Sequence, residues 1–127
     1  PDDQINYLGT NQNNLEKSDF MKSMDVMVCP SISTPTWIEQ AILVSSEAYS
    51  LGVPVIGSNS GGIPEMICAG HSFKENDAES LTGVLKSFYF DWLDLNTRYV
   101  LEAHVKDIYK DERSPEACAK RISKFLI

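Results

Sequence analysis

The sequence predicts an α/β protein built on a parallel sheet that is flanked by helices. Two short apolar runs, 26–29 and 53–56, have the pattern of strands covered on both faces, which is typical of parallel sheets. Apolar residues at helical spacing lie between them over 41–51, and Gly52 follows where a helix usually stops. Strand, helix and strand at this spacing predict a βαβ unit, whose crossover is right-handed in nearly all proteins.

The amino-terminal half is expected to continue this alternation. A short strand is predicted over 5–8 and a helix over 15–23. Two prolines, two serines and two threonines in 30–36 indicate a loop at the carboxyl end of the first buried strand. A tight loop over 58–62 opens a short helix at Ile63, because the proline and glutamate that follow suit a first helical turn.

The carboxyl-terminal half is expected to be mostly helical. Phe73 is placed on one more short strand, and Asp77 is a candidate N-cap for a long helix. Two further helices are predicted, one around Val100 and one that begins at Pro115. The long helix carries four aromatic residues that we interpret as core: Phe88, Tyr89, Phe90 and Trp92.

The length, net charge and cysteine content of the chain limit the partners and the cellular setting that we expect. The chain has 127 residues, enough for one domain, and its 11 Lys and Arg against 18 Asp and Glu give a net charge of −7. This charge repels phosphate polymers and anionic membranes, so nucleic acid is not an expected partner and membrane contact by this segment is not supported. Cys29, Cys68 and Cys118 are odd in number and share no metal-type spacing, which indicates reduced thiols in a cytoplasmic setting. His71 and His104 have no cluster of carboxylates or thiols around them, so we expect no metal.

Two glutamates stand beside the helix predicted over 41–51. The loops at the carboxyl ends of parallel strands form the ligand crevice, and a helix that follows presents free N–H groups to anions. Glu39 and Glu47 are 8 positions apart (47 − 39 = 8), which corresponds to a rise of about 12 Å in a helix. The two carboxyl groups of a glycoside hydrolase are only about 5 to 9.5 Å apart, so hydrolysis by this pair is disfavoured. The pair therefore suits the two ends of an extended ligand such as a nucleotide-sugar. The pattern alone leaves open that both acids simply face water.

Ordered motifs carry a family resemblance. The chain contains DVMVCPS at 25–31, glutamates at 39 and 47, GVPVIG at 52–57 and GGIPE at 61–65. Together they resemble the donor-binding domain of the group 1 (family 4) retaining glycosyltransferases of GT-B architecture. The resemblance is dense over 19–67 and looser over 68–127, and it implies a Rossmann-like domain.

The resemblance implies roles for individual residues. Glu39 matches the first glutamate of the family's E-x7-E motif, the catalytic position, which contacts the transferred sugar and stabilises charge at the reacting centre. Glu47 matches the second, which binds the ribose hydroxyls. The resemblance implies further donor-binding positions in two segments. At the helix start, backbone N–H groups meet the diphosphate, and beside it lies a glycine pair. These positions are Ala41, Ile42, Leu43 and Val44 at the helix start, and Gly61 and Gly62 in the pair.

Three further positions bear on this site. Ile42 replaces the family's usual glycine, so we expect its branched side chain to crowd the donor. The family's diphosphate-binding Arg and Lys lie upstream of the matched region, and Lys17 does not match them. Trp37 is a candidate for stacking on a base or sugar, or for packing on the sheet edge.

We interpret residues 1–127 as a single partial donor-binding domain without the family's acceptor-binding domain, and expect it to be inactive alone. The implied donor is a nucleoside diphosphate sugar, with no metal or other cofactor. A carbohydrate or lipid-linked acceptor would bind through the missing domain. We expect a cytoplasmic protein, and the full-length form could also attach peripherally to the membrane. Two alternatives remain: a noncatalytic binding or interaction module with this fold, and another doubly wound domain, such as an epimerase or flavodoxin-like module, with 39–44 away from the crevice.

Overall fold

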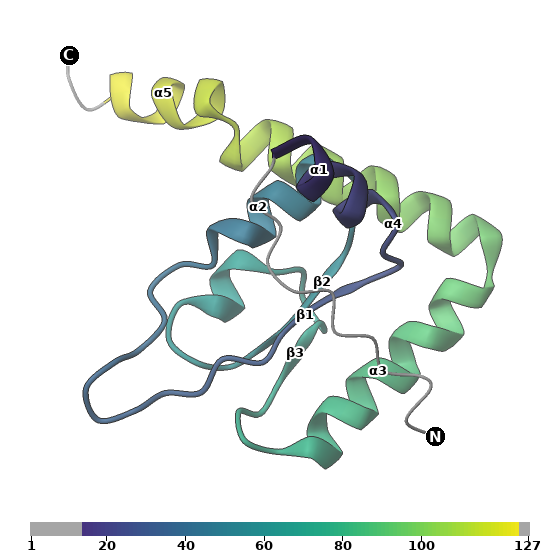
Figure 1. Cartoon of the computed structure of the whole chain (residues 1–127). Helices are drawn as coiled ribbons and strands as arrows, with labels where there is room; N and C mark the ends of the chain where they lie inside the picture. Colours follow the sequence, from purple (N-terminus) through teal and green to yellow (C-terminus); the bar gives the residue numbers. More distant parts are fainter. Residues whose placement is uncertain (1–13, 125–127) are drawn as a thin grey trace.

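Three parallel strands form the sheet of the computed structural model, which describes residues 14–124 (Figure 1). They are β1 (Met27–Cys29), β2 (Val55–Ser58) and β3 (Ser72–Phe73), in the spatial order β1-β2-β3. Both pairings are parallel, as predicted, and β2 lies in the centre. The strand predicted over 5–8 lies outside the described residues. The α/β class and the parallel βαβ arrangement are therefore confirmed.

Helices alternate with these strands as far as the helix that follows β3, and the described chain after that helix is helical. The helices are α1 (Asn14–Lys22), α2 (Leu43–Ser50), the 3₁₀ helix η2 (Ile63–Met66), α3 (Ala78–Leu93), α4 (Leu95–Ile108), the π-helical turn η3 (Tyr109–Arg113) and α5 (Pro115–Ser123). Each predicted helix is present, but α2 begins two positions later than expected. It ends as predicted, because Gly52 adopts the left-handed conformation, with φ of +82°, that favours glycine after a helix. Asp77 caps α3 by accepting the Ser80 N–H at 2.9 Å.

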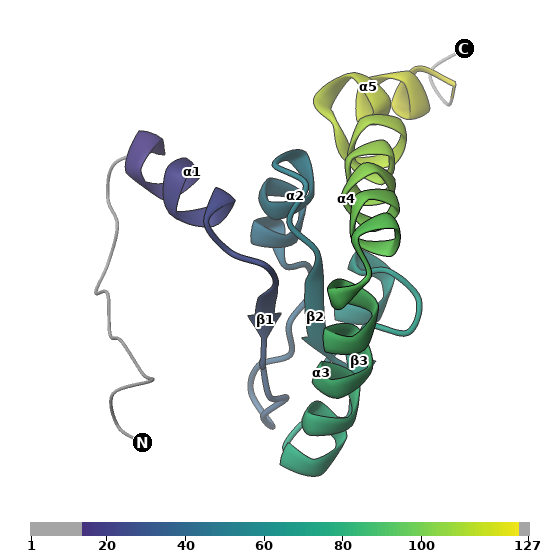
Figure 2. The ribbon, with the colours of Figure 1, turned by 90° about the vertical axis from the view of Figure 1, so that its right-hand side faces the viewer.

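The core lies on both faces of β2, whose four residues are all buried. Successive side chains of a strand point to opposite faces. Val55 packs with Tyr49 of α2 and Val105 of α4, whereas Ile56 packs with Phe88 of α3. In Figure 2, α3 and α4 form a column beside the strands, with α1 on the other side of the picture. The sheet is thus flanked by helices, as expected of a Rossmann-like domain.

Two of the four aromatic residues interpreted as core are not in it. Phe88 is buried, and Trp92 is half-buried against it with the ring centroids 5.2 Å apart. Tyr89 and Phe90, however, are 57% and 69% exposed. Neighbouring residues of a helix point about 100° apart, so one helix presents only a stripe of side chains to a sheet. The interpretation of Tyr89 and Phe90 as core is wrong for this reason.

The described chain also bears on the expectations from composition. Its three cysteines are free thiols: Cys29, Cys68 and Cys118. Within residues 14–124, no helix combines the length and the apolar character that crossing a lipid bilayer requires. In the same part of the chain, no three His, Cys, Asp or Glu side chains gather as they would around a metal ion.

Candidate functional site

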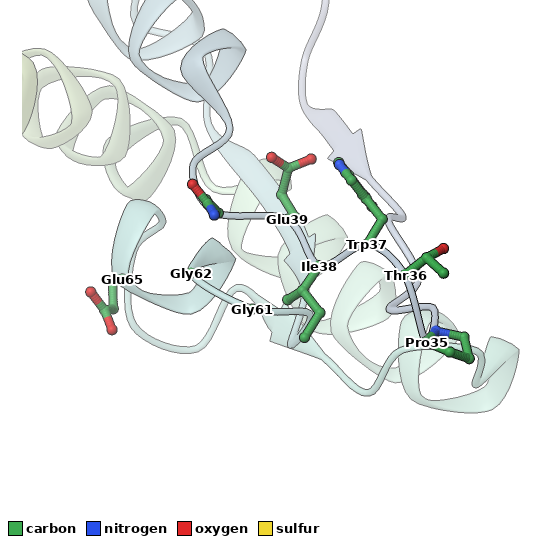
Figure 3. A pocket seen from close by; sticks show the side chains of 9 residues that line it. Pro35, Thr36, Trp37, Ile38, Glu39, Gly61, Gly62 and Glu65 are labelled. Carbon is green, nitrogen blue, oxygen red and sulfur yellow. The ribbon is translucent and has the colours of Figure 1, made fainter.

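The candidate site lies where loops follow the carboxyl ends of β1 and β2. The loop after β1 spans residues 30–42 and carries Glu39, and the loop after β2 spans 59–62 and carries two glycines. A cavity of about 630 Å³ lies between them (Figure 3). It is lined by segment 35–40, by the glycine pair and by Glu65. This is the edge at which ligands bind in parallel α/β sheets.

Gly61 and Gly62 press directly against the backbone that carries Glu39. A Cβ atom on Gly61 would lie 2.0 Å from the carbonyl oxygen of Glu39, and one on Gly62 would lie 2.2 Å from that of Gln40. Gly61 also has φ of +51°, a backbone conformation that other residues seldom adopt. The Gly62 N–H donates a hydrogen bond to the Glu39 carbonyl at 2.9 Å. The glycine pair thus fixes the main chain at Glu39.

Glu39 and Trp37 project from the same side of their loop, with Ile38 on the other (Figure 3). Both line the first cavity and a second one of about 560 Å³, which extends to Ala41 and Leu43. Trp37 is 53% exposed, which leaves much of its ring free for a ligand. Burial raises the pKa of the Cys29 thiol, and the nearby negative charge of Glu39 raises it further. The charge of Glu39 thus acts on the thiol at the end of β1.

The start of α2 is open, unlike the starts of three other helices. Asp77, Asp94 and Ser114 cap α3, α4 and α5 with side-chain oxygens. Among the residues that the structure describes, no side chain caps α2, whose N-cap residue is Ile42. The first N–H groups of a helix have no partner inside it, and Leu43, at this start, is 75% exposed. These donors can therefore meet an anion.

Ile42 does not obstruct this helix start with its side chain. The residue is 6% exposed and belongs to the hydrophobic cluster that contains Tyr49 and Val55. The side chain that was expected to crowd the donor is instead buried in the core. Ile42 thereby anchors the first turn of α2, and it can contribute only its backbone to a ligand.

Glu47 lies one turn further along α2 and forms an ion pair with α1. Its Oε2 atom is 2.5 Å from the Lys17 ammonium nitrogen, and both side chains are partly exposed. The two residues line a third cavity of about 300 Å³. Glu39 and Glu47 therefore line different cavities, whereas Leu43 and Glu47, four positions apart, share one face of the helix.

Sequence reasoning did not identify Lys17 as the ion-pair partner of Glu47. Lys17 and Glu47 lie on different helices, so their contact depends on how α1 and α2 pack. Periodicity within one helix gives no signal for such a pair. The only signal in the sequence was that the predicted helix over 15–23 carries a basic residue, Lys17, which could pair with an acidic residue of the next helix.

Comparisons with known proteins identify the family of the chain. A model of the family described as glycosyl transferases group 1 matches residues 1–125. The chain belongs to this family. It is also 36% identical over 73 residues to WcaL of Salmonella typhimurium strain LT2, which is assigned as a colanic acid biosynthesis glycosyltransferase. That match covers 54% of this chain and only 18% of WcaL, so the chain spans a small part of its relative. The group 1 resemblance is thus confirmed, while family 4 and retention stay predictions.

Proposed function

We propose that this chain is the nucleotide-sugar-binding part of a retaining glycosyltransferase. The observation that carries the proposal is the uncapped, exposed start of α2, with Glu39 before it and Glu47 one turn inside it. Membership of the group 1 family supports sugar transfer as the reaction. The donor is a nucleoside diphosphate sugar, and the acceptor hydroxyl belongs to a carbohydrate or lipid-linked molecule bound by another part of the complete protein, in the cytoplasm.

The donor diphosphate binds at the start of α2 in this proposal. The N–H groups of Leu43 and Val44 donate to its oxygens, and the positive end of the helix dipole favours its charge. The bond between the anomeric carbon and the diphosphate oxygen breaks with its electron pair on the diphosphate. The acceptor oxygen then bonds to that carbon on the face from which the diphosphate departs, and its proton passes to the departing diphosphate oxygen. The helix start stabilises the leaving diphosphate, and the proposal assigns no metal or other cofactor.

Glu39 binds the transferred sugar. Its ionised carboxylate accepts hydrogen bonds from sugar hydroxyls and stabilises the positive charge that develops at the anomeric carbon. The contact of its main chain with the glycine pair supports this role, because a fixed backbone holds the carboxylate in place without reorganisation. Trp37, on the same side of the loop, offers an apolar ring face to the sugar.

Glu47 binds the ribose of the nucleotide. A carboxylate has two oxygens with about four acceptor positions. The Lys17 ammonium group takes up an acceptor position on only one oxygen, Oε2, so other acceptor positions of the carboxylate remain for ribose hydroxyls. Both side chains are partly exposed, so the pair is worth only about 0 to 1 kcal/mol and can yield to a ligand.

Calorimetric titration with UDP-glucose, GDP-mannose and ADP-glucose tests the proposal. We expect one of them to bind, and Glu47→Ala to weaken its affinity by roughly tenfold or more, because charge-assisted hydrogen bonds to ribose are lost. Lys17→Met is the matched control, since it breaks the same ion pair but keeps the carboxylate. It should change the affinity by less than about threefold.

Two outcomes of this titration would contradict the proposal. If no nucleotide-sugar binds at millimolar concentration, or if Glu47→Ala binds as well as the unmodified chain, α2 does not form a donor site. In the complete protein, a Glu39→Ala variant with undiminished sugar transfer would remove Glu39 from the reaction. A complete protein that binds the donor without transferring sugar would instead be a noncatalytic module.

A further inference from the structure

Glu75 is a charged residue that the donor site described above does not use, and it joins the loops beside that site. It follows β3, and the three parallel strands end at the same edge of the sheet. Its Oε2 atom accepts a hydrogen bond from the Ser33 N–H at 2.5 Å. Its own N–H donates to Oδ1 of Asn59 at 2.8 Å. Glu75 therefore links the loop after β1 with the loop after β2.

A second set of contacts holds the same loop near its beginning. The hydroxyls of Ser33 and Ser60 lie 2.9 Å apart, and Ser60 is fully buried. The Ser58 hydroxyl donates to the Ser31 carbonyl at 2.6 Å. The glycine pair holds the far end of the loop at Glu39. The cavity-lining segment thus lies between two fixed points, and Glu75 contributes to the first of them.

We propose that Glu75 is a positioning residue for the sugar side of the donor site, a role that rests on the proposed function. A hydrogen bond to a carboxylate is stronger than one between neutral groups, so the bond from Ser33 restrains the loop effectively. Movement at Ser33 shifts Trp37 and Glu39 relative to α2. The start of α2 is held separately, because Ile42 is anchored in the core. Loss of Glu75 therefore disturbs contacts to the sugar more than contacts to the diphosphate.

Paired ligands separate positioning from a general structural role. Each nucleotide-sugar is titrated beside its nucleoside diphosphate: UDP-glucose with UDP, GDP-mannose with GDP, and ADP-glucose with ADP. Glu75→Ala should weaken the nucleotide-sugar by roughly tenfold and the nucleoside diphosphate by less than about threefold. Glu75→Gln should restore most of the affinity, since its amide oxygen still accepts a hydrogen bond. Glu79→Ala, an exposed acid nearby in α3, is the matched control and should bind as the unmodified chain does.

Amide hydrogen exchange gives a readout that needs no ligand. Glu75→Ala should speed exchange of the Ser33 N–H by roughly tenfold at unchanged global stability, and Glu75→Gln should speed it less. Equal losses for both ligands of a pair, or unchanged affinity for both ligands whatever the exchange rate of the Ser33 N–H, would overturn the positioning role. If the unmodified chain binds neither ligand, the proposed function fails and this role fails with it. If it binds both and Glu75→Ala matches it, only the positioning role is wrong.

Discussion

Gly62 shows how one residue can control the approach of two loops. It has φ of −84°, which any residue can adopt, so its need for glycine comes from space alone. The nearest obstacle to a Cβ atom is the Gln40 carbonyl oxygen, which belongs to the backbone and cannot rotate away. An added methyl group would therefore push residue 39 and its neighbours out of place.

Gly62→Ala is expected to destabilise the chain by about 1 to 3 kcal/mol, the usual cost of overpacking, and to weaken nucleotide-sugar binding. Urea unfolding and calorimetry measure the two effects. Gly83→Ala is the control, because a Cβ there meets nothing within 4 Å and lies inside α3. It should stabilise the chain by about 0.5 to 1 kcal/mol and leave binding unchanged. Equal behaviour of the two variants would refute the role given to the glycine contact.

Several residue contacts could not be read from the sequence. Ser33 and Glu75 are 42 positions apart, and their bond joins a backbone N–H to a side chain. Glu47 and Lys17 lie on separate helices. Spacing rules relate residues within one element. They therefore pointed to Glu39 and Glu47 around the start of α2, but not to the contact of Glu47 with Lys17 or to that of Ser33 with Glu75. The orientation of Ile42 also depends on packing, which explains why it was expected to crowd the donor.

At the scale of elements, α2 is the helix on which the proposal depends. Its side-chain cap is missing among the described residues, while three other helices have one. An uncapped start leaves N–H donors that a ligand can satisfy. A substitution that removes one of these donors without disturbing the helix therefore tests the element directly.

Leu43→Pro removes the first helical N–H of α2 at a position where proline is well tolerated. We expect it to weaken nucleoside diphosphate binding by roughly tenfold, because one hydrogen bond to a charged group is lost. Leu43→Ala is the control: the side chain is 75% exposed, so its removal should leave affinity unchanged. Calorimetry with UDP, GDP and ADP measures both. Identical affinities for the two variants would mean that this N–H does not contact the ligand.

Elements were the level at which sequence reasoning succeeded best. The strand runs 26–29 and 53–56 were recognised because they are continuously apolar, although the observed β2, Val55–Ser58, is shifted two residues toward the carboxyl end and takes in Ser58, which was predicted as loop. Asp77 and Pro115 marked helix starts for local reasons that need no tertiary context. The face that a helix buries was less predictable, because the four consecutive or nearly consecutive aromatic residues of α3 point in different directions. Only packing decides that Phe88 points inward.

At the scale of the whole molecule, the buried polar residues of the described chain are all serines, and the one histidine packed against the sheet is only half-buried. His71 is half-buried beside β2, with Nδ1 3.2 Å from the Val55 carbonyl oxygen and its ring edge-on to Phe88. Burial lowers the pKa of this imidazole below its ordinary 6.5, although the Val55 contact and the charge of Asp91 act in the opposite direction. The folded chain therefore favours neutral His71.

Folding stability should consequently depend on pH through His71. Below pH 6.5 the unfolded chain binds a proton before the folded chain does, so stability falls as pH drops toward the lowered pKa and levels off beneath it. His71→Gln should lose less stability than the unmodified chain between pH 7 and pH 5 in urea unfolding. His104→Gln, at an exposed position on α4, is the control and should follow the unmodified chain. Parallel curves for all three would show that His71 is not responsible.

The central claim is that a nucleoside diphosphate binds at the start of α2, and amide chemical shifts test it most directly. Uniformly ¹⁵N-labelled chain is titrated with UDP, GDP and ADP, and the shift of each backbone N–H is followed. We expect the largest changes at Leu43 and Val44, with smaller ones at Glu47. Changes confined to a distant region, such as the cavity between η3 and α5, or no changes at all, would contradict the claim.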